Sequence, residues 1–404
     1  MPKNTNVIFY SYLRGGSSIG SEVFNLDPQT FLWYEPLDAF YSAHFGIPHK
    51  TIPGNLLYWN NVTKRELLYD ERRWLVSFFR NMFECKLNEL PADLFAHELS
   101  HKANQLRGFT DCYKNINETI TIETCRAYTI PTCGRTIESS IGEQCHVVLE
   151  AARRISKSLP AETGASFYLN DRERQKYTSL LQQTVAEMRV TLHGQIQHAL
   201  GDFIVHQMCV NAMYAQVSKC LPKATEICQK SRLHVAKVTR LRFDELEELT
   251  FLYPDLKVIY FARDPRGIAY SRAEVGLVKS ARNLHYIEEA RYICLRMRND
   301  IAKKEILEHR YPGKVLTITY EFLVRHPQIY AERVYKHLNQ KAPEAWMNFM
   351  KRNDKAAADS GPFGLVRRNP LRTAIHWKRK VNVLGRQTMT HRCQSVLEKL
   401  KYEL

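Results

Sequence analysis

Two short turns in this chain combine cations, glycines and hydroxyl groups, which are the groups that bind an oxyanion. The first turn is RGGSSIG, from Arg14 to Gly20. Its glycines permit backbone conformations that are closed to other residues and let a ligand approach the main chain. We expect Ser17 and Ser18 to cap a helix whose free N–H groups and positive dipole end attract an oxyanion, next to the charge of Arg14. The alternative is an ordinary strand-to-helix turn that serine caps.

The second turn is RDPRGIAYSR at residues 263–272, which places three arginines and a serine after an apolar run. Asp264 is a good helix cap and Pro265 suits the first helical turn, so a helix is expected to begin here. The cations and Ser271 then crowd the carboxyl end of a strand and predict a second anion-binding position. The alternative is that Asp264 and the arginines pair with one another on a solvated helix end.

Glu35 ends the apolar run TFLWYE, directly before Pro36. In parallel sheets the ligand crevice lies beyond the carboxyl ends of the strands, so Glu35 is expected to face the same crevice as Arg14. A carboxylate in that place can accept a proton. The alternative is a structural carboxylate at a strand end.

The elements that must position these groups follow a β-α-β pattern. Residues 7–12 are mainly β-branched or aromatic, which favours a strand covered on both faces of a parallel sheet. Further strands are predicted at residues 30–35, 233–238, 256–262 and 315–319. Helices are predicted at residues 63–83, 243–252 and 285–309, from Pro327, from Pro343, and at the end of the chain. The pattern predicts an α/β fold with one parallel sheet.

Two regions are harder to interpret. Residues 91–201 are rich in charged and amide side chains, and within them residues 171–200 resemble one long polar helix. Residues 359–380 combine glycine, proline and a cluster of cations, which predicts an ordered loop over a ligand or a basic surface strip.

The composition is that of a basic globular protein. The chain has 404 residues, 44% of them hydrophobic, which is enough for a substantial core. Its formal net charge of +16 attracts anionic partners such as nucleic acids, sulfated or sialylated glycans, and nucleotides, and the charge alone does not choose among them. No apolar run reaches about 18 residues, and no signal peptide precedes the first strand. We therefore expect an N-terminal membrane anchor that this sequence lacks.

Ten cysteines occur without any CxxC pair, which argues against a zinc knuckle and favours disulfides. We expect most cysteines from Cys85 to Cys228 to be bridged, above all Cys209, Cys220 and Cys228. The histidines follow no metal-binding spacing, and no metal site is predicted. Glycosylation sequons begin at Asn61 and Asn117, and with the disulfides they indicate a secretory compartment.

Taken together, the two turns resemble the cofactor-binding segments of sulfotransferases. The chain looks most like the Golgi carbohydrate 6-O-sulfotransferases that modify galactose or N-acetylglucosamine, of the keratan sulfate type. The resemblance covers residues 6–45 and 209–404. It extends through WYEPL at residues 33–37, KVIYFARDPRG at residues 257–267, Tyr320-Glu321 with Leu323, VRRN at residues 366–369, and Trp377-Lys378.

The resemblance implies a single sulfotransferase domain over residues 1–404, with a P-loop-like three-layer fold and a helical insertion at about residues 91–205. The implied co-substrate is 3′-phosphoadenylyl sulfate (PAPS), and the implied partner is a glycan, which can be acidic, rather than a nucleic acid. The 5′-phosphosulfate is expected at Arg14, Gly15, Gly16, Ser17, Ser18, Ile19 and Gly20, and the 3′-phosphate at Arg263 and Ser271. Arg367 and Arg368 are expected to close a basic loop on the nucleotide. Two positions depart from the family: Gly15 replaces a usual serine, and Phe322 a usual aspartate.

The sulfuryl transfer that the resemblance implies needs the kinds of residue found in the two turns. Sulfuryl transfer needs in-line attack on a group whose charge spreads over its oxygens, so the protein mainly positions and neutralises. Arg14 is expected to stabilise the leaving oxygen, and Glu35 to accept the proton of a sugar hydroxyl. Two other functions stay open. A nucleotide-dependent kinase is disfavoured because Gly20 is followed by Ser21 and not by the lysine of GxxxxGK[ST]. The other is a catalytically inactive, basic glycan-binding protein.

Overall fold

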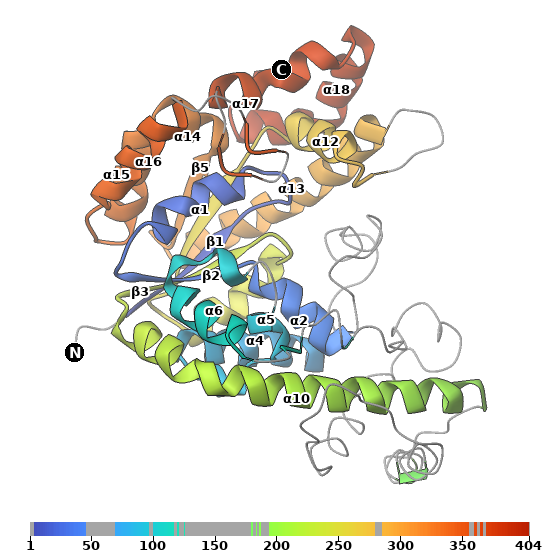
Figure 1. Ribbon diagram of the computed structural model, residues 1–404. Coiled ribbons are helices and arrows are strands. Elements are labelled where there is room, and N and C mark those ends of the chain that lie inside the picture. The colour runs from blue at the N-terminus through green and yellow to red at the C-terminus, as the bar shows by residue number, and fades with distance from the viewer. Residues whose placement is uncertain are drawn as a thin grey trace. The chain divides into compact units, whose positions relative to one another are not determined.

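The five strands form one parallel sheet in the order β2-β3-β1-β4-β5, so that β1 (Thr5–Tyr10) is the middle strand of this computed structural model (Figure 1). The other strands are β2 (Thr30–Tyr34), β3 (Leu233–Val238), β4 (Lys257–Ala262) and β5 (Val315–Thr319). The register places Tyr10 opposite both Val238 and Tyr260, so three strands end together at one edge. The predicted α/β fold with a parallel sheet is confirmed, and the five predicted strands lie within two residues of their expected bounds.

The structure describes residues 4–45, 69–96, 100–116, 119–120, 125, 179–180, 183, 186, 194–278, 285–354, 359–361, 364–366 and 369–403. Contacts divide the chain into two compact units. The first has residues 1–35, 51–79 and 230–404, and the second has residues 36–50 and 80–229. Within the described ranges, no helix is both long enough and apolar enough to cross a membrane.

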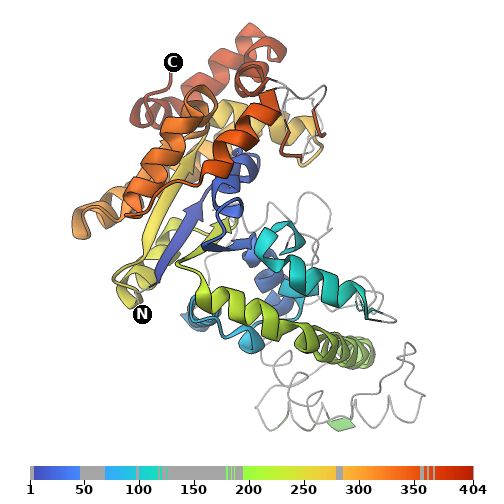
Figure 2. The same ribbon diagram turned by 60° about the vertical axis from the view of Figure 1, so that its left-hand side comes forward.

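The first unit covers both faces of its sheet, because successive strand residues point to opposite sides. Phe9 packs on Phe24 of α1 (Ser17–Asn25), and Phe261 packs on Tyr330 of α15 (Pro327–His337). On the other side, Tyr10 donates a hydrogen bond to Asp300 of α13 (His285–Arg310) at 2.7 Å. The sheet is thus the middle of three layers. Figure 2 shows β1 leading directly into α1, both in blue.

The remaining helices of the first unit follow the sheet strands. They are α11 (Leu246–Leu252), α12 (Pro265–Glu274), α14 (Tyr320–Arg325), α16 (Glu344–Asp354), α17 (Pro370–Lys380) and α18 (Val383–Lys399). The expectation of a loop over residues 359–380 was wrong for α17. This helix has a strong start signal: the side chain of Asn369 accepts a hydrogen bond from Arg372 N–H, and Pro370 occupies the first helical position.

The second unit is helical in its described residues and is held by three disulfides. It contains α2 (Pro36–Phe45), α5 (Asp93–Ala96), α6 (Arg107–Lys114) and almost all of α10 (Gly194–Lys230). The expected helix at residues 63–83 is described from Tyr69 as α4 (Tyr69–Phe83), which crosses the boundary between the units. Most of the expected polar helix at residues 171–200, and most of the expected insertion, lie outside the described residues.

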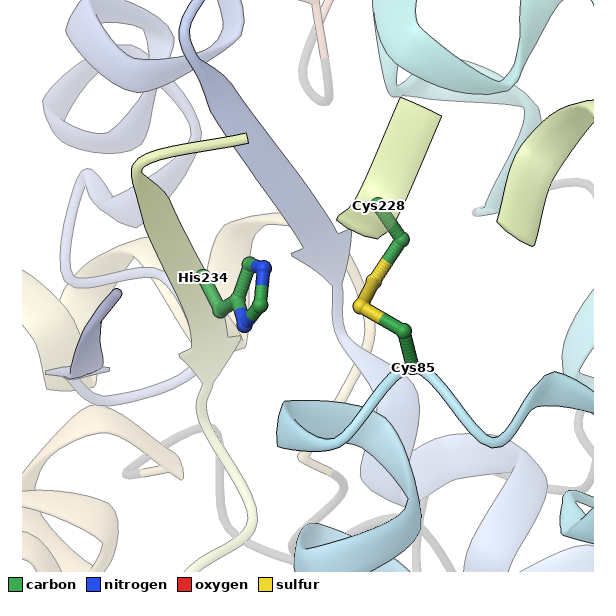
Figure 3. A group of neighbouring side chains, drawn as sticks. All are labelled: Cys85, Cys228 and His234. Atoms are coloured by element: carbon green, nitrogen blue, oxygen red, sulfur yellow. A yellow bond between two sulfur atoms is a disulfide. The ribbon is translucent and has the colours of Figure 1, made fainter. Parts of the chain in front are cut away.

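The disulfides confirm the prediction for the clustered cysteines. Figure 3 shows the Cys85–Cys228 bond, and two more bonds join Cys112 to Cys220 and Cys125 to Cys209. A fourth bond, in the first unit, joins Cys294 of α13 to Cys393 of α18. That pair was not predicted, because Cys294 and Cys393 lie outside the two cysteine clusters of the sequence.

Candidate oxyanion site

The loop after β1 has the tight backbone that the RGGSS pattern predicts. Arg14 and Gly16 both have left-handed backbones, with φ of 68° and 80°, and Gly15 N–H donates to the Tyr12 carbonyl at 2.7 Å. The expected serine cap was wrong: Gly16 is the N-cap of α1, without a side-chain cap bond, and Ser17 is the first helical residue. Because Gly16 occupies the cap position, both serines lie inside the helix.

The start of α1 leaves three backbone N–H groups ahead of its own hydrogen-bond ladder. The first helical bond runs from Gly20 N–H to the Gly16 carbonyl at 3.1 Å, so the N–H groups of Ser17, Ser18 and Ile19 precede it. Such groups, at the positive end of the helix dipole, bind anions.

Side chains are excluded from the loop on its inner side. A Cβ atom at Gly15 would lie 2.7 Å from the Tyr12 carbonyl, and one at Gly16 would clash with the ring of Tyr320. The loop therefore presents main chain rather than side chain to a ligand. It also has no room for a serine side chain at position 15.

The second turn lies beside the first, as expected for two neighbouring parallel strands. Arg14 Nε donates to Ser271 Oγ at 3.1 Å, and Arg263 Nη1 donates to the Arg14 carbonyl at 2.8 Å. Arg263 is buried against the ring of Tyr320, and its Nε has no hydrogen-bond partner among the described residues. A buried, unpartnered guanidinium N–H is a group that an anionic ligand can satisfy.

The alternative interpretation of the second turn holds for one arginine. Asp264 caps α12 through Arg266 N–H and forms an ion pair with the Arg266 guanidinium at 2.9 Å. This pair is buried rather than solvated, and neither Arg263 nor Arg272 forms an ion pair with Asp264 in the described structure. The sequence alone did not separate these roles.

Glu35 lies two strands away from Arg14 at the same edge of the sheet, and cations hold its carboxylate. Lys237 Nζ contacts Oε1 at 2.5 Å, while Arg240 and Thr239 bind Oε2 at 2.5 and 2.7 Å. Burial raises the pKa of Glu35, but the charges of Lys237 and Arg240 and the hydrogen bonds from Lys237 and Thr239 outweigh it and lower the pKa to about 2. Glu35 is therefore ionised at neutral pH.

Tyr34 connects the cluster around Glu35 with the loop between β1 and α1, which is called the anion loop below. Its hydroxyl donates to Ser18 Oγ at 2.7 Å, and the ammonium of Lys237 lies 4.0 Å from the centre of its ring. Ser18 Oγ is thus an acceptor toward Tyr34, which leaves its hydroxyl hydrogen for a ligand.

Sequence reasoning missed Lys237, Arg240, Tyr34 and Tyr320 as members of the site. One signal was present: Lys237 is the single cation in the strand LHVAKV, and a lysine in a buried strand needs a partner. Arg367 and Arg368, which were expected to contact the nucleotide, lie outside the described residues.

The chain is similar to known sulfotransferases. The sulfotransferase family profile matches residues 146–344, a range that includes the second turn but not Arg14 or Glu35. Carbohydrate sulfotransferase 1 from Homo sapiens is 28% identical over 210 residues, 46% of this chain and 50% of that protein. The same protein from Rattus norvegicus gives the same figures, and the one from Danio rerio is 28% identical over 213 residues, 46% of this chain and 49% of its own. The chain spans about half the length of the curated relatives it matches.

Two solved structures are similar at lower identity. The sulfotransferase domain of the curacin biosynthetic pathway is 17% identical with a TM-score of 0.36, over 63% of this chain and 84% of that one. The sulfotransferase domain of the Synechococcus PCC 7002 olefin synthase is 12% identical with a TM-score of 0.39, over 100% and 97%. The expected resemblance to carbohydrate sulfotransferases is confirmed by the family and relative matches.

Proposed function

Starting from the match to the sulfotransferase family, we propose that the protein transfers a sulfuryl group from PAPS to a hydroxyl of a glycan, namely the 6-OH of galactose or N-acetylglucosamine. The observation that carries the proposal is that Arg14, Arg263 and Ser271 meet at one edge of the sheet. Beside them lie the first three backbone N–H groups of α1, which have no partner within the helix. PAPS has two separate anionic groups, and this edge offers two anion-binding positions.

The two positions divide the nucleotide between them. The main chain from Gly15 to Gly20 binds the 5′-phosphosulfate, and Arg14 neutralises it. Arg263 and Ser271 bind the 3′-phosphate, which is the group that distinguishes PAPS from ATP. Arg367 and Arg368 complete the nucleotide site as a basic loop.

The reaction exchanges one sulfur–oxygen bond for another. The sugar hydroxyl oxygen attacks sulfur in line, and the bond from sulfur to the bridging phosphate oxygen breaks. The products are the sulfate ester, adenosine 3′,5′-bisphosphate and the proton of the hydroxyl. Arg14 and the N–H groups of Ser17 and Ser18 stabilise the charge that develops on the leaving oxygen. No divalent cation is part of the proposal.

Glu35 is the proposed proton acceptor, and its contacts limit that role. A base works best when its pKa lies near the working pH, whereas Lys237 and Arg240 hold Glu35 at about 2. We therefore expect proton transfer to Glu35 to contribute at the lower end of the usual range, roughly 10²-fold. Holding Lys237 and Arg240 in place is the other role of this carboxylate.

The proposed site of action is the Golgi lumen, with the protein carrying N-linked glycans. The four disulfides among the described residues support an oxidising compartment, because disulfides form and persist there.

Transfer of radiolabelled sulfate from PAPS to a panel of galactose- and N-acetylglucosamine-terminated glycans tests the function. We expect label on the 6-OH of one class and none with Arg14→Ala. Transfer of phosphate from labelled ATP would point to a kinase. Glycan binding without transfer of either label would point to an inactive binding protein.

A further inference from the structure

Arg272 is an arginine of the second turn that the proposed site does not use. It is 2% exposed and follows Ser271 on α12. Its Nε donates to the carbonyl of Leu13 at 3.0 Å, and its Nη1 forms an ion pair with Glu289 of α13 at 2.5 Å. Its Nη2 has no hydrogen-bond partner among the described residues. Arg272 therefore connects the loop after β1 to the long helix that covers one face of the sheet.

Two arginines of this turn hold two successive carbonyl groups of the anion loop. Arg263 binds the carbonyl of Arg14, and Arg272 binds the carbonyl of Leu13. Arg14, whose backbone lies between these two carbonyl groups, is left-handed, with φ of 68°. A non-glycine residue persists in this conformation only where its surroundings impose it. Side-chain bonds to both carbonyls do so here.

Glu289 fixes Arg272 in turn. It is 4% exposed, so its carboxylate and the guanidinium are a buried pair. Further along α13, Arg296 and Asp300 form a second buried pair, and Asp300 accepts hydrogen bonds from Tyr10 and Tyr12 of the same chain segment that leads into the loop. The polar side of α13 thus holds the segment from Tyr10 to Leu13 at several points.

We propose that Arg272, oriented by Glu289, is a positioning residue that holds the anion loop in its ligand-binding conformation through the Leu13 carbonyl. The proposal rests on the proposed function for the identity of that ligand. It differs from the role given to Arg263, which contacts the 3′-phosphate itself. The two roles lead to different measurements.

The first test is binding by calorimetry, with adenosine 3′,5′-bisphosphate and adenosine 5′-phosphate as probes. Arg272→Lys keeps the charge but cannot bind the Leu13 carbonyl and Glu289 with the same planar group. We expect it to weaken binding of both probes by roughly tenfold, because one charge-assisted hydrogen bond to the loop is lost. The ratio of the two affinities should stay at the wild-type value, whereas Arg263→Lys should reduce that ratio.

Two further variants keep the test independent of folding defects. Glu289→Gln removes the ion pair but keeps the size of the side chain, and should reproduce the effect of Arg272→Lys in weaker form. Arg291→Lys is the matched control, since Arg291 lies on the exposed side of α13 and its guanidinium is 61% exposed. It should bind both probes like wild type.

The second test is amide hydrogen exchange in the ligand-free proteins. We expect faster exchange at residues 13–18 in Arg272→Lys and Glu289→Gln than in wild type and Arg291→Lys, with the β4 amides unchanged. Wild-type exchange at these residues would overturn the positioning role, and so would a changed affinity ratio in Arg272→Lys. If wild type binds neither probe, the proposed nucleotide function fails while the exchange data still decide the role of Arg272.

Discussion

The ion pair between Glu35 and Lys237 allows a quantitative prediction. The pKa of Glu35 falls from 4.5 to about 2, a difference of about 2.5 units, which corresponds to about 3 kcal/mol of stabilisation of the charged form in the fold. The Lys237 side chain is 0% exposed and that of Glu35 is 10% exposed, so solvent screens the pair little. Breaking the pair from one side leaves the other charge buried.

We expect Glu35→Gln to lower the free energy of unfolding by about 3 kcal/mol at pH 7, because it leaves the ammonium of Lys237 buried opposite a neutral amide. Lys237→Met should cost less, since Glu35 keeps Arg240 and Thr239 as partners. The double variant should be more stable than the sum of the single losses predicts, because no charge is then left alone. Urea unfolding of the ligand-free, disulfide-intact proteins measures all three.

The pH dependence of stability tests independently whether ionised Glu35 stabilises the fold. The folded-state pKa of Glu35 is depressed, so the unfolded chain binds more protons as the pH falls. The stabilisation is complete above pH 4.5 and is lost between about pH 4.5 and pH 2. The difference in stability between wild type and Glu35→Gln should therefore shrink in that window. Additive losses in the double variant, or a difference that does not change with pH, would refute the reasoning.

The same Glu35→Gln protein separates structure from catalysis. Turnover per folded molecule should fall by roughly 10²-fold, with nucleotide affinity nearly unchanged. If turnover follows the folded fraction alone, Glu35 is an anchor for its two cations, and the proton acceptor is another group.

Three more predictions concern the nucleotide and the disulfides. Arg14→Ala should weaken both nucleotide binding and turnover, because a cation at the phosphosulfate acts on the ground state and the transition state; calorimetry and sulfate transfer check this. Wild type should bind adenosine 3′,5′-bisphosphate roughly 10- to 100-fold more tightly than adenosine 5′-phosphate, since the contact of Arg263 with the 3′-phosphate is charge-assisted, and equal affinities would remove the assignment. Replacing both Cys294 and Cys393 by serine should lower stability by about 4 kcal/mol, as their bond closes a loop of about 100 residues. Peptide mapping without reduction should recover that bond, and urea unfolding measures the loss.

Local patterns in the sequence were sufficient for the elements that carry the site. The apolar runs before Arg14 and Arg263 predicted β1 and β4, and the turn residues after them predicted the starts of α1 and α12. These features depend on residues a few positions apart, because strand burial, proline at the first helical position and glycine turns are local effects. The helix α17 was missed although Asn369 and Pro370 form a local start signal, because the glycine, proline and cations around them favoured a loop.

Tertiary structure alone decided which charged groups meet. Glu35 contacts Lys237 and Arg240, more than 200 residues later, and its pKa depends on that encounter. The pairing of Cys294 with Cys393 depends in the same way on the packing of α13 against α18. Arg263 and Arg272 look alike in the sequence, yet Arg263 binds the carbonyl of Arg14, whereas Arg272 forms a buried ion pair with Glu289. Electrostatic energies depend on distance and burial, which a pattern of strand residues does not contain. The sequence therefore determined the strands and turns that carry the site, and the fold determined which charged groups meet there.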